Sequence, residues 1–253
     1  MKDGLEATIK SVLNQSEASN IEFIVIDGGS DDGSIEVIEK YKSKIDIIKI
    51  EGDKGIFDAM NKGINLSNGK YCYYLNSGDE FASNDVLEVV INTITETNSE
   101  YNIIHGSVAT YRFNEYIGLS KSYPWLAHQS AFVKRDLLLD YRFDESLKIF
   151  GDLDLWTRLR KDGKYICYEV DKVIANMELD GIGSNPKYIL FRLQDKFTFA
   201  KKHSDFGNFI ETFVVAIVGY FVFKIFGEKF YYHHYISILE RFKRIIKKEK
   251  EVK

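Results

Sequence analysis

The chain has 253 residues, of which 45% are hydrophobic and 28% charged, a globular composition that argues against disorder over most of its length. The formal net charge of −4 argues against nucleic acid as the main partner. From Asp205 onward, 9 basic and 6 acidic residues give +3, which leaves −7 for the preceding body. This asymmetry predicts an acidic body that carries the chemistry and a basic tail that attaches it to a partner or a surface.

The two cysteines, Cys72 and Cys167, lie in strand-like runs and are predicted to be buried free thiols in a reducing compartment. The apolar residues between positions 5 and 13 alternate with polar ones at helical spacing, which is unlike a secretory signal. We therefore expect a cytoplasmic protein.

The first 79 residues alternate between helical and strand-like patterns. Apolar side chains recur at helical spacing in three segments, which are residues 3–15, 35–41 and 57–66. Short β-branched or aromatic runs predict strands at residues 21–27, 45–50 and 71–75. The order α-β-α-β-α-β indicates an α/β fold with a mostly parallel, Rossmann-like sheet flanked by helices.

The remaining pattern completes this architecture. Further helices are predicted at residues 85–97 and 152–161, and further strands at 103–109, 129–133 and 165–169. After Pro186 the pattern is wholly helical. We expect a catalytic domain over residues 1–185 and a helical extension over 186–253.

The chain opens on a helix, whereas a doubly wound domain usually opens on a strand. We therefore expect an N-terminally truncated domain with a gap near the middle of its sheet, unless another segment fills that place.

Two of the predicted strands end in polar loops, where ligands of parallel sheets bind. In the first loop, Asp27 and Ser30 flank two glycines, so the backbone can approach a nucleotide and Asp27 can accept a hydrogen bond from it. In the second, Ser77, Gly78 and Asp79 are suited to a diphosphate and its Mg²⁺ or Mn²⁺, with Asp79 as metal ligand. Ordinary strand-to-helix turns explain both loops equally well.

A third group begins the helix at residues 152–161, where Asp152 is either a helix cap or a general base. Weaker candidates are Lys54 as a phosphate contact and Asn61 as a residue that orders the cleft. We place three residues on the acceptor side, namely His128, Gln129 and Asp154. A structural role is the plainer explanation for each of these side chains.

Taken in order, five segments resemble family 2 glycosyltransferases of the glycosyltransferase-A (GT-A) fold, and particularly the bacterial surface-polysaccharide branch with colanic-acid-type enzymes. The segments are IVIDGGSDDGS (24–34), KGIFDAMNKGI (54–64), NGKYCYYLNSGD (68–79), HQSAFVK (128–134) and GDLDLWTRL (151–159). The helix EATIKSVLNQ (6–15) adds to the likeness.

The resemblance implies a metal-dependent, inverting transfer of a sugar from a UDP- or GDP-linked donor to a glycan or lipid-linked acceptor. Asp27 would lie beside the donor nucleoside, Asp79 would bind the metal, and Asp152 would be the general base. The chain departs from the family where Gly28 follows Asp27 and where Asn76-Ser77-Gly78 replaces a run of acids. The thinned acidic motif and the missing first strand keep open a non-catalytic remnant that binds nucleotide or protein partners. A nucleotidyltransferase would need a basic glycine-rich loop near the N-terminus, which the sequence lacks.

The segment 212–223 is uncharged and is followed by three tyrosines and a basic run from Arg241 to Lys248. Twelve residues are too few to span a bilayer, which takes about 20. An apolar helix followed by an aromatic, basic one predicts peripheral contact of residues 207–250 with the inner face of the cell membrane. A helical hairpin packed on the catalytic domain or on a second subunit is the alternative.

Overall fold

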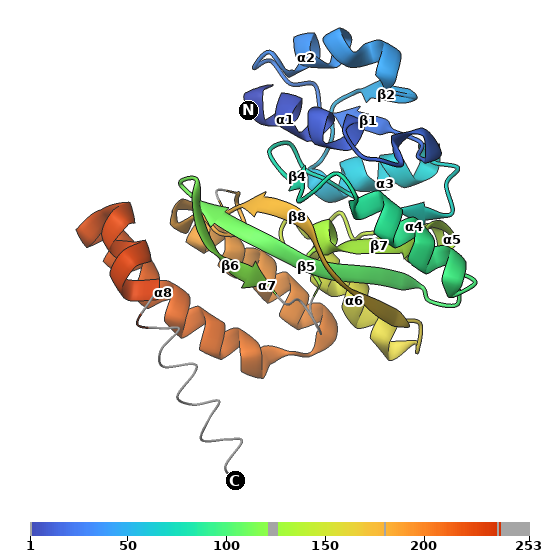
Figure 1. Cartoon of the computed structure of the whole chain (residues 1–253). Helices are drawn as coiled ribbons and strands as arrows, with labels where there is room; N and C mark the ends of the chain where they lie inside the picture. The colour runs from blue at the N-terminus through green and yellow to red at the C-terminus, as the bar shows by residue number, and fades with distance from the viewer. Residues whose placement is uncertain (1, 121–125, 180, 237, 239–253) are drawn as a thin grey trace. The chain divides into compact units, whose positions relative to one another are not determined.

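A computed structural model describes residues 2–120, 126–179, 181–236 and 238 (Figure 1). Internal contacts divide the chain into two compact units, Met1–Leu179 and Asp180–Lys253. The first unit is an α/β domain and the second is helical, which confirms the predicted fold class and the helical extension.

The strands of the first unit form two sheets. β1 (Ile24–Asp27) pairs in parallel with β2 (Ile47–Ile50). The second sheet has six strands, in the order β3 (Tyr71–Cys72), β7 (Ala131–Lys134), β5 (Ile103–Arg112), β8 (Cys167–Glu178) and β4 (Glu80–Phe81), with β6 (Glu115–Ser120) paired to β5. Among the described residues no strand pairing joins the two sheets, and the expected truncation stays a prediction.

The larger sheet is mixed, which corrects the expectation of mostly parallel strands. Only β5 and β8 pair in parallel within it, while β3, β4, β6 and β7 run antiparallel to their neighbours. β5 returns directly as β6 through a tight turn in which Phe113 and Asn114 both have positive φ. A hairpin return of this kind reverses the strand without a crossover helix, so the neighbouring strands are antiparallel.

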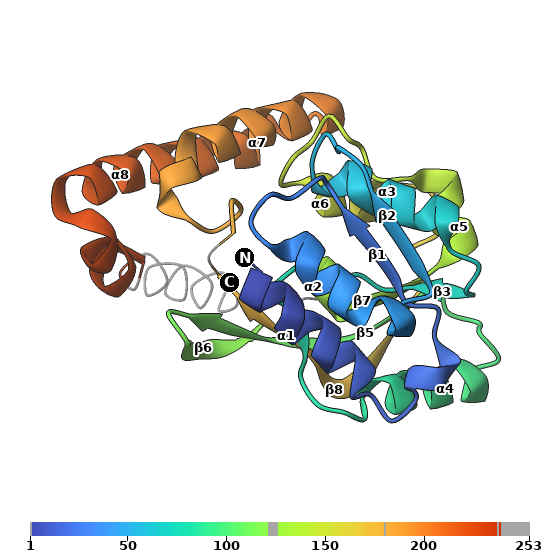
Figure 2. The ribbon, with the colours of Figure 1, turned by 90° about the horizontal axis from the view of Figure 1, so that it is seen from above.

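Six helices cover the sheets of the first unit. They are α1 (Lys2–Leu13), α2 (Ser34–Tyr41), α3 (Ile56–Leu66), α4 (Val86–Glu96), α5 (Arg135–Tyr141) and α6 (Gly151–Lys161). α1 lies beside α2 (Figure 2), and both bury apolar side chains against β1. The predicted helices agree with these within a few residues at each end, whereas α5 was not predicted.

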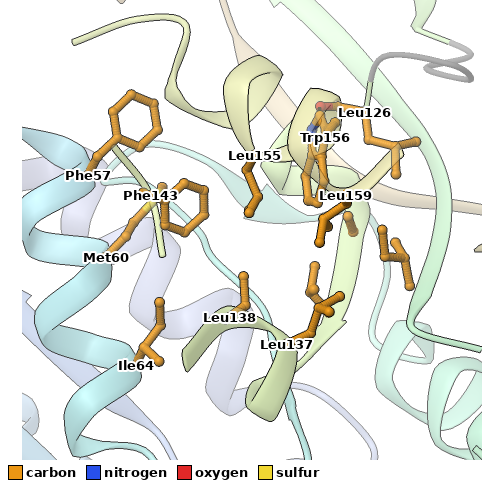
Figure 3. Close-up of a cluster of buried hydrophobic side chains, with 13 residues drawn as sticks. Phe57, Met60, Ile64, Leu126, Leu137, Leu138, Phe143, Leu155, Trp156 and Leu159 are labelled. Atoms are coloured by element: carbon orange, nitrogen blue, oxygen red, sulfur yellow. Dashed lines mark hydrogen bonds between the residues drawn. The ribbon is translucent and has the colours of Figure 1, made fainter. Parts of the chain in front are cut away.

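The largest hydrophobic cluster joins α3, α5 and α6 (Figure 3). Trp156 of α6 is 1% exposed, and its Nε1 donates to the Leu126 carbonyl at 2.8 Å. At the start of α6, a Cβ on Gly151 would lie 2.5 Å from the Phe57 ring of α3. Glycine therefore lets α6 begin in direct contact with α3, which sets the position of Asp152 in the first turn of α6.

The second unit contains α7 (Ile189–His203) and α8 (Phe206–Phe230), followed by a π-helical segment, Tyr231–Ile236. Ile189, Leu193 and Tyr231 form its small buried core, and Gly227 interrupts α8 with a φ of 80°. None of the helices within the described ranges has the length and apolar character needed to cross a membrane.

Candidate functional site

The loop 76–79, which follows β3, is held by α1. The Thr8 hydroxyl accepts a hydrogen bond from the Gly78 amide at 3.0 Å and donates one to the Asp79 carbonyl at 2.7 Å. Gly78 has a φ of 100°, a conformation that glycine adopts without strain. A Cβ on Gly4 would lie 3.1 Å from the Gly78 Cα, so α1 touches the loop backbone. The loop is therefore rigidly placed at the end of β3.

Asp79 carries a buried carboxylate, with 5% of the residue exposed. Its Oδ2 accepts a hydrogen bond from Gln129 Nε2 at 2.8 Å. Burial raises the pKa of the Asp79 carboxyl above its usual value, and the hydrogen bond from Gln129 offsets part of that rise. Tyr73 fixes Gln129 in turn, because its hydroxyl donates to the Gln129 carbonyl at 2.8 Å.

Asp152 lies in the first turn of α6 and faces His128. Its Oδ1 accepts a hydrogen bond from the Leu153 amide at 2.8 Å, and its Oδ2 lies 3.5 Å from His128 Nδ1. His128 Nε2 is 3.0 Å from the side-chain nitrogen of Asn76, three residues before Asp79. Loop 76–79, His128–Gln129 and the start of α6 thus converge, although about 75 residues of chain separate the first from the last.

The Asp27 loop and the Lys54 loop lie together at the carboxyl ends of β1 and β2. Asp27 Oδ1 accepts hydrogen bonds from the amides of Gly29 at 2.9 Å and Ser30 at 2.7 Å, so the carboxylate closes its own turn. A Cβ on Gly28 would lie 2.4 Å from Asp53 Oδ2, which brings the two loops into contact. These contacts fit either a nucleotide-binding turn or a purely structural one, and the predicted binding roles stay predictions.

Two of the predicted site residues have mainly structural contacts. Asn61 is buried, and its side chain donates to the Phe143 carbonyl at 2.9 Å and accepts from the Phe143 amide at 3.0 Å. Asp154 is 0% exposed and pairs with Arg158 at 2.8 Å. A fully buried, paired carboxylate presents no surface to an acceptor, so we assign Asp154 to holding α6 in place.

Replacing Arg158 by methionine is expected to destabilise the protein by about 3 kcal/mol, because Asp154 would stay buried without its counter-ion. Arg158 also donates to the carbonyls of Tyr141 and Arg142, which attaches α6 to the end of α5. Urea unfolding of Arg158→Met measures the effect. The exposed pair of Lys42 and Glu39 provides the control, since Lys42→Met should change stability little. Equal effects of the two variants would contradict the assigned role.

A separate hollow of about 470 Å³ lies between α1 and residues 80–84, and its lining includes Glu6, Lys10 and Glu80. Asp79, His128 and Asp152 do not line it. The converging side chains, not this hollow, therefore define the candidate site.

The metal-binding potential of the site rests on Asp79. In the ranges that the structure describes, no three His, Cys, Asp or Glu side chains form a group that could hold a metal ion. The predicted metal-binding role of Asp79 stays a prediction, and its buried carboxylate is compatible with that role, because a nearby cation compensates the charge that burial disfavours. The remaining ligands would have to come from a bound diphosphate, as is common for Mg²⁺.

Sequence reasoning missed two contributors to this site. Thr8 fixes the loop backbone and Asn76 contacts His128, yet neither was singled out as a site residue. Asn76 could have been identified from its position in the loop 76–79, which follows a predicted strand. Nothing in the local pattern distinguishes Thr8 from other polar helix residues.

Relatives in sequence cover parts of the chain. An uncharacterized glycosyltransferase of Mycobacterium tuberculosis is 37% identical over 93 residues, which are 37% of this chain and 36% of that protein. A cholesterol galactosyltransferase of Borreliella burgdorferi is 39% identical over 98 residues, 38% of this chain and 27% of that protein. A PGL/p-HBAD biosynthesis glycosyltransferase of Mycobacterium bovis is 26% identical over 174 residues, 61% of this chain and 67% of that protein. The first two matches therefore span only about a third of the relatives' length.

Solved structures share the fold at low sequence identity. S. aureus TarS 1-349 in complex with UDP has a TM-score of 0.57 and 14% identity, covering 76% of this chain and 61% of that one. The mannosyltransferase PcManGT from Pyrobaculum calidifontis, in complex with GDP-Man and Mn²⁺, has a TM-score of 0.62 and 13% identity, covering 81% and 61%. The model of the family described as "Glycosyl transferase family 2" matches residues 2–144, more than half of the chain. The chain therefore belongs to glycosyl transferase family 2.

Proposed function

We propose that the protein transfers a sugar from a UDP- or GDP-linked donor to an acceptor hydroxyl, with inversion at the anomeric carbon. The observation that carries this proposal is the convergence of Asp79 and Asp152 on the adjacent residues Gln129 and His128. Solved structures of the same fold in complex with UDP, UDP-GlcNAc and GDP-Man support the donor class. A glycan or lipid-linked glycan of a bacterial surface polysaccharide is the acceptor that we propose.

In this reaction Asp152 acts as the general base. It takes the proton of the acceptor hydroxyl while the oxygen attacks the anomeric carbon from the face opposite the diphosphate. The bond between the anomeric carbon and the phosphate oxygen breaks, and its electron pair leaves with the nucleoside diphosphate. The side chain of Asp152 is 23% exposed, so an acceptor can reach it.

Asp79 would hold Mg²⁺ or Mn²⁺ together with the diphosphate, and such an ion stabilises negative charge on the leaving group. Gln129 orients the Asp79 carboxylate. On the donor side we retain Asp27, Ser30 and Lys54, whose loops meet at the ends of β1 and β2, together with Ser77 and Gly78.

A non-catalytic remnant that binds nucleotide or a protein partner is the second candidate. The division of the described strands into two unpaired sheets favours it, because a donor site built on strand ends of both sheets needs them held at a fixed separation. Calorimetric titration of UDP and GDP, with and without Mn²⁺, tests nucleotide binding, and release of the diphosphate from the bound donor type tests turnover. Metal-dependent binding with turnover supports the transferase, and binding without turnover supports a nucleotide-binding remnant. No nucleotide binding by the folded protein contradicts the transferase and favours a remnant that binds a protein partner.

We further propose that the second unit attaches the protein to the inner face of the cell membrane. Six apolar side chains of α8 are 49–69% exposed. Five of them recur every three or four residues and form an exposed stripe of Ile210, Val214, Val218, Phe221 and Ile225. Residues 180–253 contain 14 basic and 8 acidic residues, a balance of +6. Like charge opposes pairing of two such units, whereas an anionic lipid surface attracts them. The predicted basic run from Arg241 to Lys248 lies outside the described residues.

Replacing Ile210 and Ile225 by glutamate is expected to lower partitioning onto phosphatidylglycerol-containing vesicles on the order of a hundredfold. The reason is that two exposed isoleucine side chains, which would insert partly into the lipid, are lost from the contact. Vesicle sedimentation of the full chain measures this. Ile166→Glu is a matched control, since Ile166 is 46% exposed and lies in the first unit. Unchanged partitioning of the double variant would contradict the role of the stripe, and a dimer that the same substitutions dissociate would assign the stripe to a second copy.

A further inference from the structure

We infer that His128 is a positioning residue for Asp152 and that Asn76 selects the tautomer in which it acts. The inference rests on the proposed function, in which Asp152 is the general base. It assigns His128 to the catalytic carboxylate, whereas the sequence suggested only a place on the acceptor side. Three side chains carry the argument, and all three belong to the first unit.

The contact with Asn76 determines where the His128 proton lies. The side-chain nitrogen of Asn76 is 3.0 Å from His128 Nε2. With the Asn76 amide in this orientation, its NH₂ group only donates hydrogen bonds, so Nε2 accepts and carries no proton. In neutral histidine the single N–H is then on Nδ1. Asn76 thus turns the donor side of the ring toward α6.

The Nδ1 atom of His128 is buried and has no hydrogen-bond partner. Asp152 Oδ2 lies 3.5 Å from it, slightly beyond the usual hydrogen-bond range. A buried donor without a partner costs about 1–3 kcal/mol, so a small movement of Asp152 toward His128 is favourable. Hydrogen bonds of catalytic groups are often long in the free enzyme and shorten when substrate binds.

Closing this contact would fix both oxygens of the Asp152 carboxylate. Oδ1 already accepts a hydrogen bond from the Leu153 amide at 2.8 Å, and Oδ2 would accept one from His128. Each oxygen keeps a second lone pair for the acceptor hydroxyl. His128 exchanges no proton in this role. It holds the carboxylate in the orientation in which Asp152 removes the proton of the acceptor.

Two substitutions of His128 distinguish positioning of Asp152 from support of the loop 76–79. In His128→Asn the side-chain amide can replace Nδ1–H, whereas in His128→Gln the longer side chain can replace Nε2 and keep the contact with Asn76. We measure kcat and KM for release of UDP from UDP-GlcNAc, or of GDP from GDP-mannose, with water as acceptor. Calorimetry of nucleotide binding with Mn²⁺ accompanies the kinetics, and His234→Asn, at an exposed histidine of the second unit, is the control.

We expect His128→Gln to lower kcat on the order of ten- to a hundredfold, with KM and nucleotide affinity nearly unchanged, since only the orientation of the base is lost. His128→Asn should retain several times more activity than His128→Gln. In combination with Asp152→Asn, neither substitution should lower the rate further. A higher rate in His128→Gln than in His128→Asn, or a loss of nucleotide affinity in both variants, would overturn the inference. Either result would show that His128 supports the loop 76–79 instead. Failure of the proposed function is distinguishable, because the unsubstituted protein would then release no nucleotide.

Discussion

Asp152→Asn is expected to lower the rate of sugar transfer by about a thousandfold, the usual range for the loss of a positioned general base. Asparagine has the same shape and can keep the hydrogen bond from the Leu153 amide to its oxygen, so α6 should still begin at the same place. Nucleotide affinity should be nearly unchanged, because Asp152 lies on the acceptor side of the proposed site. Steady-state kinetics and calorimetric titration of the nucleotide measure the two quantities separately.

The matched control for this variant is Asp136→Asn, since the side chain of Asp136 is 95% exposed in the first turn of α5. The control should retain full activity. An Asp152→Asn protein with activity within threefold of the unsubstituted chain would exclude Asp152 as the base. An equal loss of rate and of nucleotide affinity would instead assign Asp152 to donor binding.

Asp79→Asn is expected to lower Mn²⁺-dependent nucleotide affinity by about a hundredfold or more, since even residues that only support a metal ligand contribute ten- to a hundredfold. The same substitution should leave the metal-free protein at least as stable at pH 7. Burial raises the pKa of Asp79, so the folded state favours the protonated form and the ionised carboxylate is destabilising above that pKa. Asparagine removes this charge, and its oxygen can still accept from Gln129.

The pH dependence of unfolding tests the sign of this effect. In the unsubstituted protein Asp79 contributes a loss of stability as pH rises from its usual pKa through the raised value, and Asp79→Asn should lack that contribution. Urea unfolding between pH 4 and pH 8 measures the pH-dependent contribution of Asp79 to stability. The same unfolding with and without Mn²⁺ and UDP measures the stabilisation by the ligands. Ligand-induced stabilisation that is equal in the two proteins would show that Asp79 does not bind the metal.

The helices and strands of the first 79 residues could be predicted because each carries its own local signal. The apolar spacing of α1, α2 and α3 and the β-branched runs of β1 and β2 follow from periods of 3.6 and 2 residues. α5 and β6 escaped prediction for a physical reason. α5 has only seven residues and no side-chain cap, and β6 exposes most of its side chains, including Tyr116 and Ile117. α5 is held by α3 and α6, which are distant in sequence or follow it, and β6 is held by pairing with β5, so neither carries a strong signal of its own.

The relative direction of the strands likewise could not be predicted from local sequence patterns. A mostly parallel sheet was expected because strands and helices alternate, yet the hairpin at Phe113–Asn114 and the short strands β4 and β7 make the larger sheet mixed. The turn residues Phe and Asn are not the Asn-Gly or Gly-rich pairs that identify a two-residue hairpin. The pairing of these strands depends on the packing of the whole sheet.

The α/β class, the helical extension, the family and the loops that bear Asp27, Asp79 and Asp152 could be predicted from the sequence, because residue type and spacing encode local structure and motif order directly. Which of these side chains meet follows from the packing of the folded chain. It brought Asp79 to Gln129 and Asp152 to His128, and it buried Asn61 and Asp154 in structural hydrogen bonds and an ion pair. The Asp79–Gln129 and Asn61–Phe143 contacts join residues 50 or more positions apart, and no local pattern records them, since they arise from the packing of the helices around the ends of the strands. The Asp154–Arg158 pair has the i, i+4 spacing of a helix, but its burial depends on the same packing.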